Sequence, residues 1–353
     1  MLRHIRYGFL FLLVGLLGIN NVQAQINPNP RCQTLNTEYG NLYWRSRWLD
    51  NDTIEFLDWN GANGSSTLSP TKTTWYQYHA TTGVLETLDY NPFDQLKIAG
   101  NKLVDTPLKS VQAGLEGLYE YVNISPNQDF VIYPRQDETS QDMWLIDTRS
   151  KTEVPLGIGL GYPKVFWSAD EQKFVLTNTD RAANYLTPMQ LVTLVDGKIT
   201  VQQLDKIKLL SDIIPISKNY YLHGISPDGR YLLITPEYAT YETWAVDLVN
   251  QKAHILGFYI YGETDVVWTS PSKFIGIAAK LGAIRYDVVT GKQEVLAEPS
   301  EIGLYEISWE MIGSKLPKDT FIVGGHNLSP DGHYSIAQGK RDNKSQIVVC
   351  KIY

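Results

Sequence analysis

The sequence lacks most of the features that mark a catalytic or nucleic-acid-binding protein. It has only two cysteines, a net charge of −7 and no cluster of lysine or arginine. This balance excludes the basic footprint that nucleic acid requires, and it gives no attraction to anionic lipid. The motifs His-Glu-x-x-His and Cys-x-x-Cys and the phosphate-loop lysine motif are also absent. We therefore expect no cofactor, no bound metal and no nucleic-acid partner.

Only one long apolar stretch occurs, and it lies at the N-terminus. Basic residues precede an apolar run from Tyr7 to Ile19, which the sequence Val22-Gln23-Ala24 follows. This layout predicts a secretory signal over residues 1–24, with cleavage after Ala24. The run is shorter than the roughly 20 residues that span a bilayer. We expect a secreted or periplasmic protein with no stable membrane span after cleavage.

Helical periodicity of convincing length is also missing. The nearest approach is the segment from Thr106 to Tyr121, which Gly114 and Gly117 weaken. We therefore expect almost entirely β structure.

A Ser-Pro-Asp-Gly-like turn, followed by an aromatic residue and an apolar run, recurs along the chain. Proline fixes the φ angle of the second residue of such a turn, and Asp-Gly provides a residue that tolerates positive φ. Each copy therefore predicts a reversal of the chain between two strands. The copies begin, from sharpest to most degraded, at Ser226, Ser329, Ser125, Ser168, Thr269 and Leu49.

Each turn is followed by a third strand and a short hairpin that leads to a fourth strand. Several third strands end in an acidic residue, as at Asp147, Asp247 and Asp287. The anchors at 125 and 168, like those at 226 and 269, are 43 residues apart, which suits blades of about 40 to 50 residues. The sequence predicts an all-β propeller of about six four-stranded blades, with room for a seventh between the first two anchors.

The last repeat stops at Ile347–Tyr353, which leaves no residues for a fourth strand. We expect an N-terminal strand around Asn41–Trp44 to complete that blade and close the ring, which removes its exposed edges. Residues 25–41 then form an N-terminal extension and residues 42–353 the propeller. Cys32 and Cys350 lie near opposite ends of the mature chain, and we predict that they form a disulfide at the closure. Two unrelated buried thiols are the alternative.

At Ser226-Pro227-Asp228-Gly229 and Ser329-Pro330-Asp331-Gly332 the chain resembles the WD40-like repeat family of secreted and periplasmic β-propellers of the TolB type. The resemblance covers roughly residues 42–353. It implies a propeller that is used for protein contacts.

The leading interpretation is a monomeric, non-enzymatic binding or scaffold propeller that contacts a protein or a cell-envelope glycan. Amphipathic tyrosines suit both partners, because the ring stacks while the hydroxyl forms hydrogen bonds. The candidate contact residues cluster around predicted loops and strand ends: Tyr238, Tyr241, Tyr259 and Tyr261.

The alternative is a hydrolase or lyase with acids or a metal at the mouth of the central channel. His223 and His326 each lie three residues before a turn serine, so both belong on first strands. A channel metal site is one interpretation, and we favour packed histidines because valine occupies the equivalent positions in other repeats. The alternating carboxylates of Asp50, Asp52 and Glu55 suggest a calcium site, but we interpret them as a solvated turn.

Overall fold

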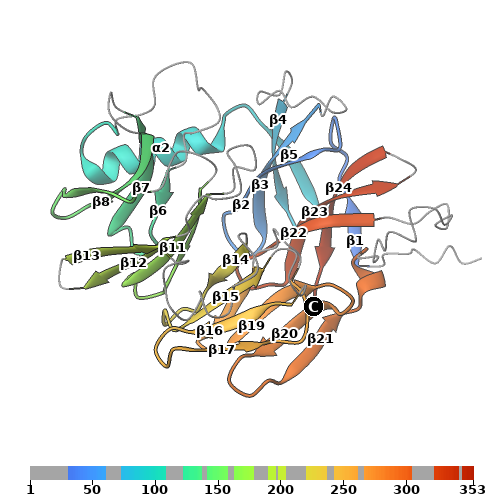
Figure 1. The fold of residues 1–353 in the computed structure, drawn as a ribbon. Helices are drawn as coiled ribbons and strands as arrows, with labels where there is room; N and C mark the ends of the chain where they lie inside the picture. Colours follow the sequence, from blue (N-terminus) through green and yellow to red (C-terminus); the bar gives the residue numbers. More distant parts are fainter. Residues whose placement is uncertain are drawn as a thin grey trace, which may run out of the picture.

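The computed structural model describes residues 31–60, 73–108, 122–136, 141–157, 163–178, 190–195, 198–203, 220–236, 242–260, 266–303, 322–341 and 344–353. Within these ranges the chain forms six four-stranded antiparallel sheets. The sheets stand around a common centre, with the first strands β2, β6, β14 and β22 innermost (Figure 1). The predicted all-β propeller is confirmed, with six blades.

The blades follow the chain in order. Blade 1 contains β2 (Leu42–Trp48), β3 (Thr53–Trp59), β4 (Thr73–His79) and β5 (Val84–Leu88). Blade 2 contains β6 (Asn123–Ile124), β7 (Phe130–Gln136), β8 (Gln141–Asp147) and β9 (Glu153–Pro155). Blade 3 contains β10 (Pro163–Trp167), β11 (Lys173–Asn178), β12 (Gln190–Val195) and β13 (Lys198–Gln203).

The second half continues in the same way. Blade 4 contains β14 (Tyr220–Ile225), β15 (Tyr231–Pro236), β16 (Trp244–Asp247) and β17 (Lys252–Ile255). Blade 5 contains β18 (Val267–Ser270), β19 (Lys273–Ala278), β20 (Gly282–Asp287) and β21 (Gln293–Ala297), followed by the short helix η3 (Pro299–Glu301). Blade 6 contains β22 (Ile322–Leu328), β23 (Tyr334–Arg341), β24 (Lys344–Lys351) and, as its outermost strand, β1 (Cys32–Thr34).

The ring closes through β1, with Cys32 opposite Cys350. Closure by an N-terminal strand is therefore confirmed, but its placement around Asn41–Trp44 is wrong, because Leu42 pairs with Asp58 inside blade 1. The chain must cross from the outer edge of blade 6 to the innermost strand of blade 1, and residues 35–41 make this crossing. The buried Asp58 carboxylate holds it by accepting the N–H groups of Tyr39 at 2.7 Å and Asn41 at 2.8 Å. The segment expected as an extension thus supplies the closing strand.

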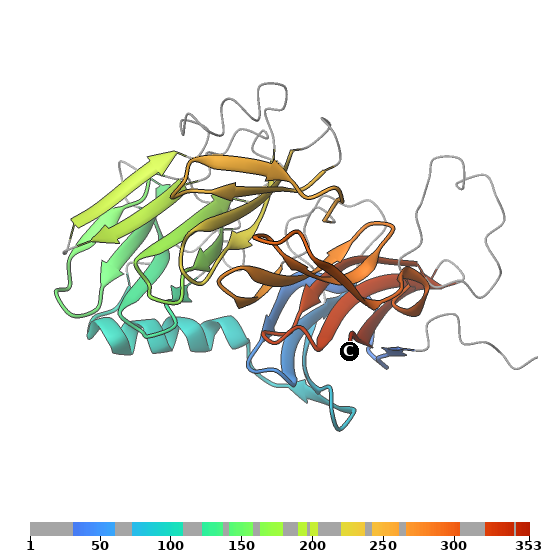
Figure 2. The ribbon, with the colours of Figure 1, turned by 90° about the horizontal axis from the view of Figure 1, so that it is seen from below.

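A helix, α2 (Pro92–Val104), lies between blades 1 and 2 where room for a seventh blade was expected. Proline suits its first turn, and Asp94 and Lys102 carry the charges that complement the dipole of the helix. The helix packs on blade 2 (Figure 2). Val104 at the end of the helix and Leu108, which follows it, cluster with Val131 of blade 2. The weak helical pattern had been placed at 106–121, of which 109–121 lie outside the described residues. Between β5 and β6, the described residues form helix α2 and no additional sheet.

Apolar layers join successive blades. Phe130 and Leu145 of blade 2 pack with Phe174 of blade 3, and comparable clusters join blades 3 to 4, 4 to 5 and 5 to 6. A further cluster joins Ile336 and Val349 of blade 6 to blade 1. Strands with period-two alternation place one apolar set on each side of a blade, so blades 3, 4, 5 and 6 each contribute to two layers between blades.

Hydrogen bonds explain the repeated turn motif. The Ser226 hydroxyl donates to Asp228 at 2.6 Å and accepts the N–H of Tyr231 at 2.8 Å, while the N–H of Gly229 donates to the Ser226 carbonyl at 2.8 Å. Ser329 makes the same three bonds in its own turn. The fourth residue has positive φ, which favours glycine. Serine, aspartate and glycine therefore recur because the turn requires them.

Replacing Gly332 with alanine is expected to lower the free energy of unfolding by about 2 kcal/mol. Its φ is +77°, and a methyl group there would lie 2.8 Å from Cδ1 of Ile275 in blade 5. Gly257→Ala is the matched control, because Gly257 has φ +78° and nothing within 4 Å of such a methyl group. It is expected to lose about 1 kcal/mol. Urea unfolding measures both variants, and equal losses would contradict a role for the contact between blades.

The acids that end several third strands have a local structural role. In each case the carboxylate accepts two N–H groups of the hairpin that follows, as Asp247 does from Val249 at 3.0 Å and Asn250 at 2.9 Å. Burial raises the pKa of Asp247, but hydrogen bonds from Arg230 and Asn250 outweigh it and lower the pKa to about 2. Asp147 and Asp287 bind their hairpins in the same way. These acids hold turns and are accounted for without a catalytic role.

Candidate functional site

The strand order gives the ring two different faces. The face that we call the turn face carries the Ser-Pro-Asp-Gly-like turns and the hairpins between third and fourth strands. The opposite face, the connection face, carries the links between second and third strands and the links from one blade to the next. Turn-face links are short, as at 226–230 and 248–251. Connection-face links include 60–72, 204–219 and 298–321. Surface loops held by a rigid scaffold often carry binding residues, so the face with the longer links is the candidate binding face.

The four predicted contact tyrosines belong to two connection-face links of blade 4. Tyr259 is half-buried, and its carbonyl accepts the N–H of Ala279 of blade 5 at 2.8 Å. Tyr238, Tyr241 and Tyr261 lie outside the described residues. By sequence, two of them belong to the link between β15 and β16, and Tyr261 follows Tyr259 in the link to blade 5.

Aromatic residues are distributed unequally between the two faces. No Phe, Trp or Tyr occurs in any of the turn-face links, which are 49–52, 80–83, 125–129, 148–152, 168–172, 196–197, 226–230, 248–251, 271–272, 288–292 and 329–333. By sequence, the connection-face links contain Tyr39, Tyr90, Phe93, Tyr119, Tyr121, Tyr162, Tyr185, Tyr238, Tyr241, Phe258, Tyr259, Tyr261, Tyr305, Trp309 and Phe321. Of these, Tyr39, Tyr90, Phe93, Phe258 and Tyr259 belong to the described residues. Sequence reasoning found one local cluster. The strand order assigns the aromatic residues of all links to the connection-face links, although most of them lie outside the described residues.

His223 is a buried member of a hydrogen-bonded chain within blade 4. Its Nε2 lies 2.8 Å from the hydroxyl of Thr235, which lies 2.9 Å from the hydroxyl of Thr243. Thr243 in turn accepts the N–H of Ile260 at 2.9 Å. This chain links the first strand of blade 4 to the segment that leads to blade 5, so His223 has the packed, hydrogen-bonded position that we favoured.

His326 is also buried, on β22 of blade 6, with 3% of its surface exposed. Its Nδ1 lies 3.0 Å from the Ser335 hydroxyl, while its buried Nε2 has no hydrogen-bond partner. Burial alone lowers the pKa of His326 to about 4, because the interior penalises the charged imidazolium. Each histidine bonds within its own blade. Among the residues that the structure describes, no group of three or more His, Cys, Asp or Glu is placed to hold a metal ion.

The carboxylates of Asp50, Asp52 and Glu55 do not converge. Asp50 accepts the N–H groups of Asp52 and Thr53 at 2.8 and 2.7 Å, and these bonds hold its pKa below the usual value. Asp52 instead accepts two hydrogen bonds from Thr81. Glu55 is buried and pairs with Arg47 at 2.6 Å. The turn interpretation holds for Asp50 and Asp52, whereas Glu55 forms a buried ion pair.

Sequence reasoning missed a buried carboxylate, Glu171, that joins two blades. Blade 2 has Asn127 where the turns at Ser168, Ser226 and Ser329 have aspartate, so Ser125 has no carboxylate of its own. Glu171 of blade 3 accepts the Ser125 hydroxyl at 3.0 Å and also the N–H of Asn127. Only 2% of Glu171 is exposed. The one signal in the sequence was the asparagine at the third position of that turn.

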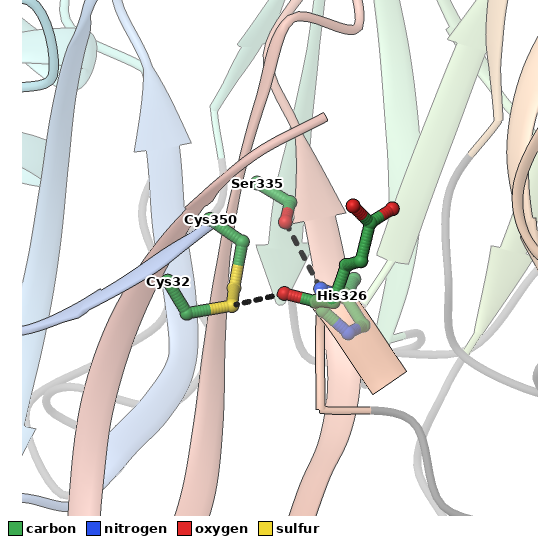
Figure 3. Close-up of a disulfide and its surroundings, with 5 residues drawn as sticks. Cys32, His326, Ser335 and Cys350 are labelled. Carbon is green, nitrogen blue, oxygen red and sulfur yellow. Dashed lines mark hydrogen bonds between the residues drawn. A yellow bond between two sulfur atoms is a disulfide. The ribbon is translucent and has the colours of Figure 1, made fainter. Parts of the chain in front are cut away.

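The predicted disulfide between Cys32 and Cys350 is present and joins residues 318 positions apart (Figure 3). Cys350 is fully buried. Arg31 fixes the same strand by donating to the carbonyl of Leu296 at 2.8 Å and by pairing with Glu301 at 3.2 Å. The closing strand is therefore held by covalent, ionic and main-chain bonds.

Comparison with known proteins finds likeness in structure and none in sequence. No protein-family profile and no curated protein matches the chain. TolB from Acinetobacter baumannii is 11% identical over 85% of this chain and 52% of its own, with a TM-score of 0.35. A prolyl endopeptidase is 14% identical over 87% and 39% of the two chains, with a TM-score of 0.39. The β-propeller domain of the Trilobed protease from Pyrococcus furiosus is 8% identical over 89% and 96%, with a TM-score of 0.37.

These likenesses concern a propeller-like fold alone. The chain spans about half the length of the TolB chain and less of the endopeptidase. In the described part of the chain, no helix is long and apolar enough to cross a bilayer.

Proposed function

We propose that this protein is an extracytoplasmic propeller of the TolB-type WD40-like family that acts by binding, without catalysis, and that its connection face contacts a protein or a cell-envelope glycan. The observation that carries the proposal is the segregation of aromatic residues. Connection-face links contain many tyrosines, and turn-face links contain no aromatic residue. Tyrosine gives large contact area with little loss of side-chain entropy, which suits a recognition surface.

Internal bonding on the turn face supports the same choice. The polar groups of its turns are already engaged, as with Ser226 and Asp228, and the acids at 147, 247 and 287 bind their own hairpins. Groups that are satisfied internally offer less to a partner than groups that are not. The turn face therefore serves to hold the ring, and recognition falls to the other face.

The test is site-specific photo-crosslinking in intact cells, together with sedimentation of the purified protein with isolated cell-wall sacculi. A photoreactive phenylalanine replaces Tyr259 on the connection face. The matched control replaces Val289, which is 63% exposed in a turn-face hairpin. If the partner is a protein, we expect crosslinked adducts with the probe at position 259 and none with the probe at position 289. If the partner is the glycan, we expect the substitution of Tyr259, and not that of Val289, to reduce the amount of protein that sediments with sacculi.

Equal labelling at the two positions would refute the choice of face. If the protein neither crosslinks to another protein nor sediments with sacculi, the binding function is refuted. Bound metal or glycoside hydrolysis in the purified protein would instead support the enzymatic alternative.

A further inference from the structure

His326 is a buried titratable group, and one of its two ring nitrogens has no hydrogen-bond partner. It lies on β22 of blade 6, and its Nδ1 bonds to Ser335 on β23. Its Nε2 is buried without a hydrogen-bond partner. A neutral imidazole tolerates this with a bare lone pair on Nε2, but a protonated ring would bury a charge and a donor with nothing to receive them.

The surroundings of His326 belong to the junction between blades 5 and 6. Along β22 and β23, Leu328 and Ala337 share its side of the sheet, and both belong to the apolar layer formed with Ile275 and Ile277 of blade 5. Cys350 lies in the same layer and pairs with Ser335 across the sheet (Figure 3). The histidine and the disulfide therefore occupy one layer, two strands apart.

Among the described residues of this junction, no charged group is hydrogen-bonded to His326. On β23 the partner of Nδ1, Ser335, is neutral, and Cys32 and Cys350 are bonded to each other and do not titrate. Strand β19 contributes Ile275 and Ile277. Arg31 and Glu301, at the edge of the same junction, pair with each other at 3.2 Å. Burial is the sole cause of the lowered pKa of His326.

We propose that His326 is an acid-sensitive latch, whose protonation opens the junction between blades 5 and 6 and exposes Cys350, the buried half of the closing disulfide. In the open form water reaches the imidazole of His326, which then binds a proton with its ordinary affinity. Acid therefore favours the open form. With a pKa of about 4 when closed and about 6.5 when open, the opening equilibrium rises about 30-fold between pH 8 and pH 5. The contribution of His326 to closure is complete above pH 6.5 and is lost as the pH falls toward 4.

The test measures the rate at which a phosphine reduces the native Cys32–Cys350 disulfide between pH 8 and pH 5. The wild-type rate is divided by the rate of His326→Gln at each pH, which cancels the pH dependence of the reagent. We expect this ratio to rise about 30-fold at pH 5, with unchanged far-ultraviolet circular dichroism. His254→Gln, a change at an exposed histidine of β17, is expected to behave like the wild type.

A ratio that stays constant with pH would overturn the proposal, and so would loss of the whole β signal at the pH where reduction accelerates. His326→Leu serves as a second variant. If neither variant folds, hydrogen exchange of the wild type decides the question after correction for intrinsic rates. Amides of β22 must then lose more protection between pH 7 and pH 5 than amides of β15, and equal changes would overturn the proposal.

Discussion

Replacing Cys32 and Cys350 together with alanine is expected to lower the free energy of unfolding by about 2 to 5 kcal/mol. The bridge joins residues 318 positions apart, so it restricts a very large loop in the unfolded chain. Chain-entropy arguments place the largest stabilisation at such separations. Urea unfolding of the double variant and the wild type measures the difference.

The packing change must be separated from the loss of the bond. Cys350 is fully buried, so alanine also removes contacts. The wild type unfolded with and without a reductant keeps the same atoms, apart from two hydrogens, and provides that control. A loss below about 1 kcal/mol in both comparisons would show that β1, Arg31 and the apolar layer hold the ring closed without the bridge.

Replacing Glu171 with alanine is expected to destabilise the protein by about 3 kcal/mol, because a buried hydroxyl loses a charged acceptor. Ser125 is 2% exposed, and its hydroxyl donates to Glu171 at 3.0 Å. In the turns at Ser168, Ser226 and Ser329 an aspartate two residues after the serine accepts this bond, at 2.6 Å from Ser226 to Asp228. Glu171 thus does from blade 3 what an aspartate at position 127 would do within blade 2.

This substitution gives a rescue experiment. Asn127→Asp in the Glu171→Ala background supplies the missing carboxylate in its usual place and is expected to recover about half of the loss. In the wild-type background the same Asn127→Asp change puts two carboxylates beside one hydroxyl and is expected to destabilise at neutral pH. Chemical denaturation of the four proteins completes the cycle. If Asn127→Asp shifts stability equally in both backgrounds, the two positions do not share the Ser125 hydroxyl.

The fold was predictable because the repeat has a local cause. Ser226, Asp228 and Gly229 encode a turn through bonds within a few residues, and such short-range chemistry can be recognised from sequence. The position of the closing strand was not predictable in this way, since β1 is only three residues long. Its pairing depends on Cys350, more than 300 positions away. Helix α2 was missed because its stability comes from the face of blade 2 on which it packs.

The candidate site was predictable only in part. Tyrosine clustering could be seen locally, but assigning Tyr259 to a face required the strand order. The valines at equivalent positions correctly indicated that His223 and His326 are packed. The orphaned Nε2 of His326 and the carboxylate of Glu171 that serves another blade are properties of contacts between blades. Such contacts leave little trace in a single sequence.

The pairing of β1 with β24 also determines how the protein can fold. Strand β1 leaves the ribosome first, yet its partner β24 is made last, so the native contact of greatest sequence separation must form at the end. Domains with many such distant contacts fold slowly. Until β24 has been made, the blades that have already folded form an incomplete ring with unpaired strand edges. Such a state is prone to self-association. We therefore expect a holdase chaperone to raise the yield of refolding from denaturant.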